Sequence, residues 1–212
     1  MKQLHSLGIY TIAIIVLLSS CAAPYRAIKP NHLNFNAHNK SENIDFSYKY
    51  DVLLERNNKR YSKKERKKGI RLVAVKLTNN SNKEIVVKDD LIFTANSQQV
   101  FPLEPTVLKQ SIKQYPATYL LYLLLTPLSF NTYDQYGNVE STIPFGLILG
   151  PGLAIGNLVG SSTANKNMVG EYSKELIINK TVGPGETITG LMAIKTTGFP
   201  TLSVLESNRK SN

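Results

Sequence analysis

Cys21 is the only cysteine among the 212 residues, and its thiol is the strongest nucleophile that the chain offers. A thiolate can form a thioether, and the small residues Ser19 and Ser20 before it leave room for an enzyme to approach. Because no second cysteine is present, the chain cannot form an intramolecular disulfide, and its fold depends on packing. We therefore expect the chemistry at Cys21 to be a covalent modification.

The other reactive side chains form no catalytic or metal-binding pattern. His5 falls in the N-terminal apolar segment, and His32 and His38 lie in a polar, Asn-rich stretch, which is too few for the usual zinc ligand sets. Asp89 and Asp90 are adjacent carboxylates, but their position between two predicted strands favours a turn or a helix cap over acid–base catalysis. We expect no enzymatic activity, no metal and no cofactor.

Residues 1–20 have the organisation of a secretory signal peptide. Lys2 supplies a positive start, and the apolar run Leu7–Leu18 is shorter than the roughly 20 residues that span a bilayer. The sequence Leu18-Ser19-Ser20-Cys21-Ala22 resembles the lipobox of bacterial lipoproteins. This resemblance covers only the N-terminal segment. It implies that the peptide is cleaved before Cys21, that the thiol carries a diacylglyceryl group and that the new amino terminus is acylated.

The segment that follows, residues 21–43, is predicted to be the lipidated N-terminus and a tether. Pro24, Pro30 and several Asn residues interrupt any apolar periodicity there. In bacterial lipoproteins an Asp after the cysteine can act as an inner-membrane retention signal, and Ala22 stands at that position here. The resemblance therefore implies an exported protein held at the periplasmic face of the outer membrane through its acyl chains.

A basic segment lies between the first two predicted strands, in a chain whose net charge is +10. It carries eight positive residues against Glu65 alone: Arg56, Lys59, Arg60, Lys63, Lys64, Arg66, Lys67 and Lys68. One interpretation is contact with anionic lipid or an envelope polymer, at about 1 kcal/mol per basic residue near an anionic surface. The favoured interpretation is a solvated loop, because exposed charge runs usually lack a specific partner. Export argues against nucleic acid as a partner.

The middle of the chain, about residues 112–170, is predicted to be a hydrophobic insertion. Ala117–Leu125 has helix formers on every face, Pro127 ends this run, and a polar turn containing Gly137 and Asn138 follows. Ile143–Gly160 has no ionisable residue and resembles a glycine-zipper segment. Its glycines, spaced for close helix packing, are Gly146, Gly150, Gly152, Gly156 and Gly160. The two runs predict a helical hairpin that either packs against the sheet, which is favoured, or enters or lies on a bilayer.

Short alternating runs on both sides of the insertion predict antiparallel strands. The predicted strands are Ile44–Val52, Ile70–Thr78, Glu84–Lys88, Leu91–Ala95, Gln99–Leu103, Glu175–Asn179, Thr187–Lys195 and Pro200–Glu206. The second and third of these are expected to pair as a hairpin, and Pro184-Gly185 fits the centre of a type II turn. Short antiparallel strands with turn signals predict a mainly β fold at residues 44–206, an antiparallel immunoglobulin-like sandwich, followed by a polar tail at 207–212.

Asn79-Asn80-Ser81 after one strand and Pro184-Gly185-Glu186-Thr187 before a later one resemble the small immunoglobulin-like domains of uncharacterised exported bacterial lipoproteins. That resemblance implies a fold and brings no activity with it. We therefore predict a membrane-anchored envelope lipoprotein that serves as a non-enzymatic binding or assembly module for an unidentified protein partner. The alternative is a component that inserts into or perturbs the membrane with its hydrophobic hairpin.

Overall fold

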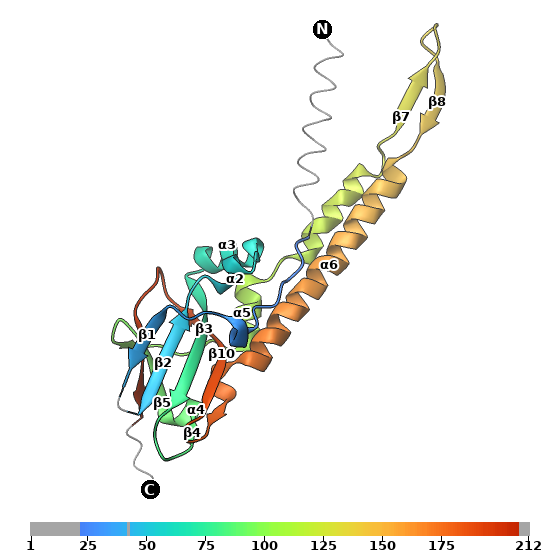
Figure 1. Cartoon of the computed structure of the whole chain (residues 1–212). Helices are drawn as coiled ribbons and strands as arrows, with labels where there is room; N and C mark the ends of the chain where they lie inside the picture. Colours follow the sequence, from blue (N-terminus) through green and yellow to red (C-terminus); the bar gives the residue numbers. More distant parts are fainter. Residues whose placement is uncertain (1–21, 42, 208–212) are drawn as a thin grey trace. The chain divides into compact units, whose positions relative to one another are not determined.

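The structure, a computed structural model, describes residues 22–41 and 43–207 (Figure 1). The predicted signal peptide, Cys21 and residues 208–212 of the predicted tail lie outside the described residues. The chain divides into two compact units. We call residues 22–24 and 114–164 the hairpin unit, and residues 25–113 and 165–207 the sheet unit.

The sheet unit contains most of the regular elements. In chain order they are η1 (Pro30–His32), β1 (Ala37–Lys40), β2 (Ile44–Lys49), α2 (Val52–Glu55), α3 (Lys59–Lys67), β3 (Ile70–Asn79), β4 (Ile85–Val86), α4 (Val87–Asp90), β5 (Leu91–Ala95), β6 (Gln98–Gln99), α5 (Pro105–Ile112), η3 (Ile177–Asn179), β9 (Thr181–Val182), β10 (Thr187–Lys195) and β11 (Leu202–Glu206). The last turns of α6 (Gly146–Glu175) also belong to this unit.

The prediction of antiparallel sheets is confirmed. A four-stranded sheet has the order β1-β2-β3-β10, a three-stranded sheet has the order β11-β5-β6, and β4 pairs with β9. Alternate side chains of both larger sheets meet in one buried cluster that includes Phe46 and Val75 from the first sheet and Phe93 and Val204 from the second. The alternation of apolar residues in these strands therefore places their apolar face in a shared core.

The second face of β3 is buried as well, which makes the fold mixed rather than mainly β. Leu72 and Ala74 are at most 1% exposed, and the helices α2 and α3 contact this strand. Tyr172, near the end of α6, donates from its hydroxyl to the carbonyl of Leu103 at 2.6 Å and accepts the amide of Ala193 in β10 at 3.1 Å. Because both faces of β3 are buried, its sequence is a nearly continuous apolar run.

The predicted hairpin between residues 70–78 and 84–88 is wrong. β3 pairs with β2 and β10, whereas β4 pairs with β9. The Asn79 side chain accepts the amide of Ser81 at 2.9 Å and donates to the carbonyls of Lys83 and Val182. This side-chain turn leads the chain away from β3. The predicted turn at Pro184-Gly185 is confirmed: the Glu186 amide donates to the Gly183 carbonyl at 3.0 Å, and Gly185 has φ +71°.

Two segments predicted to lack packed structure are ordered in the sheet unit. The predicted tether contains β1, which pairs with β2, and Ile28 is 1% exposed. Asn58 accepts the amide of Arg26 at 2.8 Å and donates to its carbonyl at 2.7 Å, so backbone contacts hold a segment that shows no apolar periodicity. The basic segment is helical, because Lys, Arg and Glu are good helix formers and its buried residues Tyr61 and Glu65 are four apart.

The predicted strand Glu175–Asn179 is also wrong, since α6 continues to Glu175 and η3 follows. A short apolar run with two isoleucines fits a strand and a buried helical turn equally well, and periodicity cannot separate them. Leu176 keeps only an isolated parallel bridge to Leu191. The polar residues from Ser161 to Lys166 lie inside α6 and do not form a loop.

The hairpin unit consists of η2 (Pro116–Leu125), the strand pair β7 (Phe130–Tyr133) and β8 (Val139–Ile143), and residues 146–164 of α6. Its polar turn lies where it was predicted: the Asp134 amide donates to Asn138 O at 2.9 Å, and Gly137 has φ +85°. Tyr119 and Tyr122 stack with their ring centroids 6.3 Å apart and pack with Ala154 of α6. The predicted helical hairpin is therefore present, although its first segment is a 3-10 helix.

Candidate functional site

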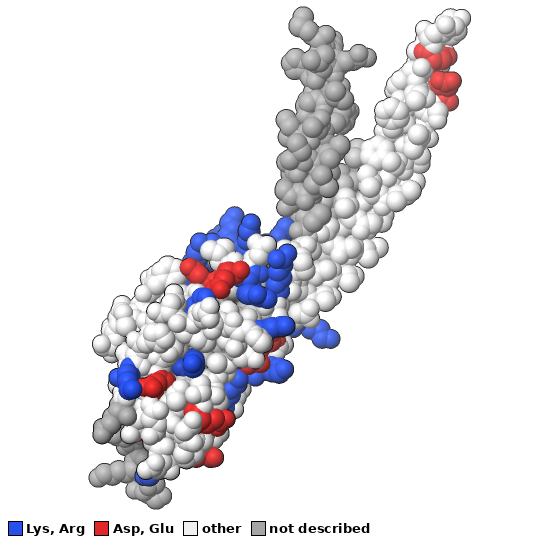
Figure 2. Space-filling model, in the orientation of Figure 1, with Lys and Arg blue, Asp and Glu red and all other residues white. Residues whose placement is uncertain are grey.

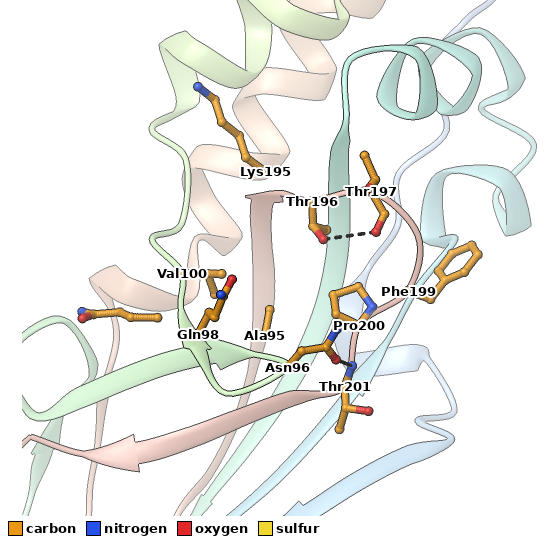
Figure 3. A pocket seen from close by; sticks show the side chains of 11 residues that line it. Ala95, Asn96, Gln98, Val100, Lys195, Thr196, Thr197, Phe199, Pro200 and Thr201 are labelled. Atoms are coloured by element: carbon orange, nitrogen blue, oxygen red, sulfur yellow. Dashed lines mark hydrogen bonds between the residues drawn. The ribbon is translucent and has the colours of Figure 1, made fainter.

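A cavity of about 580 Å³ lies in the sheet unit between the β5–β6 turn and the loop before β11 (Figure 3). The Asn96 side chain accepts the amide of Thr201 at 3.0 Å on its wall. Lys195 is the only charged residue that lines it. Its other lining side chains are neutral, among them Thr196, Thr197 and Thr201.

A second cavity of about 560 Å³ contains ionisable groups, lined among others by His32 and Glu171. The Glu171 carboxylate accepts the hydroxyl of Tyr25 at 2.5 Å and the amides of Ile28 and Lys29 at 2.8 and 2.9 Å. Burial, and after it the charge of Glu171, raise the pKa of Tyr25. This carboxylate is committed to holding residues 25–29 in place, which gives it a structural role.

Within residues 22–41 and 43–207 no group of three or more His, Cys, Asp or Glu is placed to hold a metal ion. The pair Asp89 and Asp90 lies in the single turn of α4, where Asp90 accepts the amide of Val86 at 2.7 Å. This carboxylate therefore caps a helical turn, as its position between two strands suggested.

The eight basic residues of the predicted contact segment lie on α3 and at its two ends, and Figure 2 shows Lys and Arg side chains gathered over this helix. Some of them hold the fold together: Arg56 donates to the carbonyl of Ala27 at 2.9 Å, and Lys64 donates to the carbonyl of Lys113. The exposed ones are Arg56, Lys59, Lys63, Arg66, Lys67 and Lys68. The segment thus presents a basic helix face to solvent, which we call the basic patch.

The five glycines of the zipper-like segment have different surroundings. A methyl group on Gly146 would overlap the carbonyls of Leu125, Thr126 and Leu128, and one on Gly150 would lie 2.7 Å from the Thr126 hydroxyl. Gly160 lies near Ala22, whereas Gly152 and Gly156 face open space. The first two glycines allow η2 to approach α6 closely, and the other three do not serve that contact.

Most of the large apolar side chains that are exposed among the described residues belong to the hairpin unit. We call those of η2, its flanking loop and α6 the apolar surface: Leu120, Leu121, Leu123, Leu124, Leu128, Leu147, Ile148, Leu149, Ile155 and Val159. Ile148 is 78% exposed and Leu124 is 73% exposed. Contiguous exposed apolar surface is typical of sites that bind proteins, ligands or membranes.

Charge is nearly absent from the same unit. Its only charged residues in the described chain are Asp134 and Glu140, in the turn and in β8, and Figure 2 shows it white except near that end. By length and composition α6 is able to cross a membrane, and only 28% of its most apolar stretch is buried. Length and composition alone do not separate such a helix from one in a soluble protein.

The residues next to Cys21 lie in the hairpin unit. The Ala22 amide donates to the Asn157 side chain, and Gln114 donates to the Ala23 carbonyl at 2.7 Å and accepts the Ala23 amide at 3.3 Å. We call Asn157 and Gln114 the clamp. Asn157 is a polar residue inside the apolar run Ile143–Gly160, and no sequence pattern pointed to Gln114. A lone polar residue in such a run was the available signal.

Comparison with protein families, with curated proteins and with solved structures found no match to this chain.

Proposed function

We propose that the chain is an exported bacterial lipoprotein of the cell envelope, attached by acyl chains on Cys21 to the periplasmic face of the outer membrane. The sheet unit acts as a non-enzymatic binding or assembly module for a protein partner. The observation that carries this proposal is the lipobox-like sequence ending at Cys21, followed by residues that are held against an apolar unit. Two or more acyl chains give durable membrane attachment.

We further propose that the two larger sheets with a shared core are a variant of the immunoglobulin-like sandwich. Packing of both sheets around one cluster of alternating side chains supports this assignment. Helices that cover the second face of β3 distinguish it from a simple sandwich. Edges and loops of such a domain are suited to protein recognition.

The experiment that tests the lipoprotein proposal is intact-mass measurement of the mature protein from bacterial membranes. We expect a mass that corresponds to loss of residues 1–20 plus a diacylglyceryl group and an amide-linked acyl chain. The Cys21→Ser variant should lack all of these additions. An unmodified cysteine in the wild-type protein would overturn the proposal. For the binding module, in-cell crosslinking followed by pull-down should recover the same protein partner from repeated preparations.

The apolar surface favours a second candidate function, insertion of the hairpin unit into the membrane. Burying a leucine or isoleucine side chain contributes about 1.5–3 kcal/mol, so ten such exposed side chains are a large driving force even if each is only half transferred. The test is flotation of the Cys21→Ser protein with phospholipid vesicles. We expect it to float, and we expect Leu121→Gln and Ile148→Gln together to weaken flotation. Recovery of the Cys21→Ser protein entirely in the soluble fraction would overturn this candidate.

A further inference from the structure

The described chain begins at Ala22, and this first residue is already fastened to the hairpin unit. Asn157, which is 8% exposed, accepts its amide, and Gln114, which is 3% exposed, makes two hydrogen bonds with Ala23. Ala22 also packs against the cluster of Tyr119, Tyr122 and Ala154. From residue 22 onward, the described chain therefore does not form a free spacer between a lipid anchor and the hairpin unit.

Chain geometry links the clamp to the lipid anchor. The Cα atoms of consecutive residues are 3.8 Å apart across a trans peptide bond, so Cys21 lies one such step from Ala22. Acyl chains on Cys21 would therefore start one residue before Ala22, whose amide binds Asn157. This step rests on the lipoprotein function proposed above. Ile155 and Val159 of the apolar surface lie two residues before and after Asn157, about 3 Å away along the axis of α6 and on the opposite side of the helix. The leaflet that holds the acyl chains is therefore level with this part of the apolar surface.

The composition of the unit identifies hydrocarbon as the occupant of the apolar surface. A protein partner is usually bound through an apolar centre with a polar rim, but the described residues of η2 and of α6 up to Ala164 contain no charged side chain. The exposed apolar side chains are spread over both segments of the hairpin. Such a surface fits lipid hydrocarbon, which can surround the hairpin, better than a protein partner, which would cover only one face.

The β7–β8 pair limits how the unit can lie in the bilayer. It is two-stranded and carries Asn131, Thr132, Glu140, Ser141 and Thr142. Open strand edges and a carboxylate are not tolerated in lipid-exposed hydrocarbon. If the unit crossed the membrane from a clamp at one surface, α6 from Asn157 back to Gly146 would span only about 17 Å at 1.5 Å per residue, and the strands would fall in the far leaflet of a core about 30 Å thick.

We propose that the lipid anchor and the hairpin unit occupy the same leaflet of the bilayer. The hairpin lies within this leaflet with its apolar surface in hydrocarbon, and β7–β8 returns to the head groups on the side where the chain entered. Asn157 and Gln114 hold the acylated residue beside the hairpin, so that anchor and hairpin enter the membrane together. Tyr133 and Tyr136, exposed by 60% and 80%, suit this interfacial position.

The test uses full-length acylated protein, whose Cys21 has no free thiol, with single added cysteines. Intact mass first establishes acylation, which tests the proposed function separately. The protein is added to the outside of preformed phosphatidylethanolamine–phosphatidylglycerol vesicles. A bimane label on Ile148→Cys should be quenched by phospholipids brominated in mid-chain, whereas a label on the control Lys83→Cys, an exposed residue of the sheet unit outside the basic patch, should not. Gln135→Cys, in the β7–β8 turn, should react with a membrane-impermeant maleimide before the vesicles are lysed.

Two results would overturn the proposal for protein that is acylated. An unquenched label on Ile148→Cys would mean that the hairpin stays in water. Protection of Gln135→Cys until lysis would mean that the unit crosses the bilayer. Quenching at position 148 together with immediate labelling at position 135 supports a hairpin within one leaflet. Reactivity of Lys83→Cys before lysis verifies that the sheet unit remains outside the vesicle.

Discussion

At the scale of single residues, Glu65 is the clearest case of a group whose surroundings change its chemistry. It lies on α3, is 1% exposed, and accepts the amide of Leu72 through Oε1 at 2.5 Å. Its Oε2 has no hydrogen-bond partner within the described residues. Burial raises the pKa of Glu65 to about 7, against the lowering effects of the Leu72 amide and Arg71. The folded protein therefore favours the protonated carboxyl.

This pKa gives the first prediction. Because the folded pKa of Glu65 lies above its ordinary value of 4.5, the unfolded state releases the proton first, and stability falls as pH rises from about 4.5 through about 7. A shift of this size corresponds to about 3 kcal/mol. In Glu65→Gln this loss should disappear, so that the variant is more stable than wild type at pH 8. Urea unfolding from pH 4.5 to 8 measures it, and parallel curves for the two proteins would contradict it.

The clamp gives the second prediction. Gln114→Ala removes both hydrogen bonds to the half-buried backbone of Ala23, at a cost of about 0.5–1.5 kcal/mol per hydrogen bond. Hydrogen exchange of the Ala23 amide should become faster, while exchange in β3 should not change. Gln135→Ala, at an exposed position of the turn, is the matched control. Equal exchange at Ala23 in the two variants would show that Gln114 does not hold this segment.

Single residues also show what sequence could predict. Cys21 stands out because it is unique and follows an apolar run, and its modification stays a prediction since it lies outside the described residues. The role of Gln114 could not be predicted, because no local sequence pattern indicates a hydrogen bond to Ala23, 91 positions away. Glu65 looked like one charge in a basic run, since its burial depends on how α3 packs on β3.

At the scale of elements, α3 carries the basic patch, and it gives the third prediction. Each basic residue near an anionic surface contributes about 1 kcal/mol, so Lys63→Gln with Lys67→Gln should weaken binding to phosphatidylglycerol-containing vesicles by about 30-fold at low salt. The Cys21→Ser background removes the contribution of the acyl chains. Lys83→Gln with Lys88→Gln, exposed residues outside this helix, is the control. Equal vesicle affinities for the two double variants would mean that the basic patch does not bind anionic lipid and is only a solvated surface.

The glycines of α6 give the fourth prediction. Gly150→Ala places a methyl group 2.7 Å from the Thr126 hydroxyl and 3.0 Å from its amide, so η2 must move away from α6. Gly156→Ala meets no atom within 4 Å and should stabilise the helix by up to about 1 kcal/mol. Hydrogen exchange in residues 119–125 should therefore be faster in the first variant and unchanged or slower in the second. The opposite order would mean that η2 does not pack on α6 at Gly150.

The long alternating strands were predictable as elements, and their partners were not. Residues 70–78 and 187–195 were predicted as strands, and they pair with each other as β3 and β10 across more than 100 positions. Pairing at that separation is decided by packing in the core and leaves no local signal. Helix α3 and strand β1 were missed, because a basic run and an Asn-rich segment show little apolar periodicity. Their secondary structure depends on the surfaces against which they pack.

At the scale of the whole molecule, the chain consists of a sheet unit with a buried core and a hairpin unit with few buried side chains. The sequence predicted both, as a β domain interrupted by a hydrophobic insertion. It could not distinguish a buried hairpin from one that meets a membrane, because every face of the two segments is apolar. Within the hairpin unit the apolar surface is exposed, and this exposure supports the proposed contact with a membrane.

The central claim is that the hairpin unit holds the protein to the membrane independently of the acyl chains. The most direct measurement replaces residues 1–20 with a cleavable secretion signal, changes Cys21→Ser, and washes the bacterial membranes with alkaline carbonate. We predict that this protein stays in the membrane pellet and that the same protein with Leu121→Gln, Leu124→Gln, Ile148→Gln and Ile155→Gln is released. Complete release of the Cys21→Ser protein would contradict the claim.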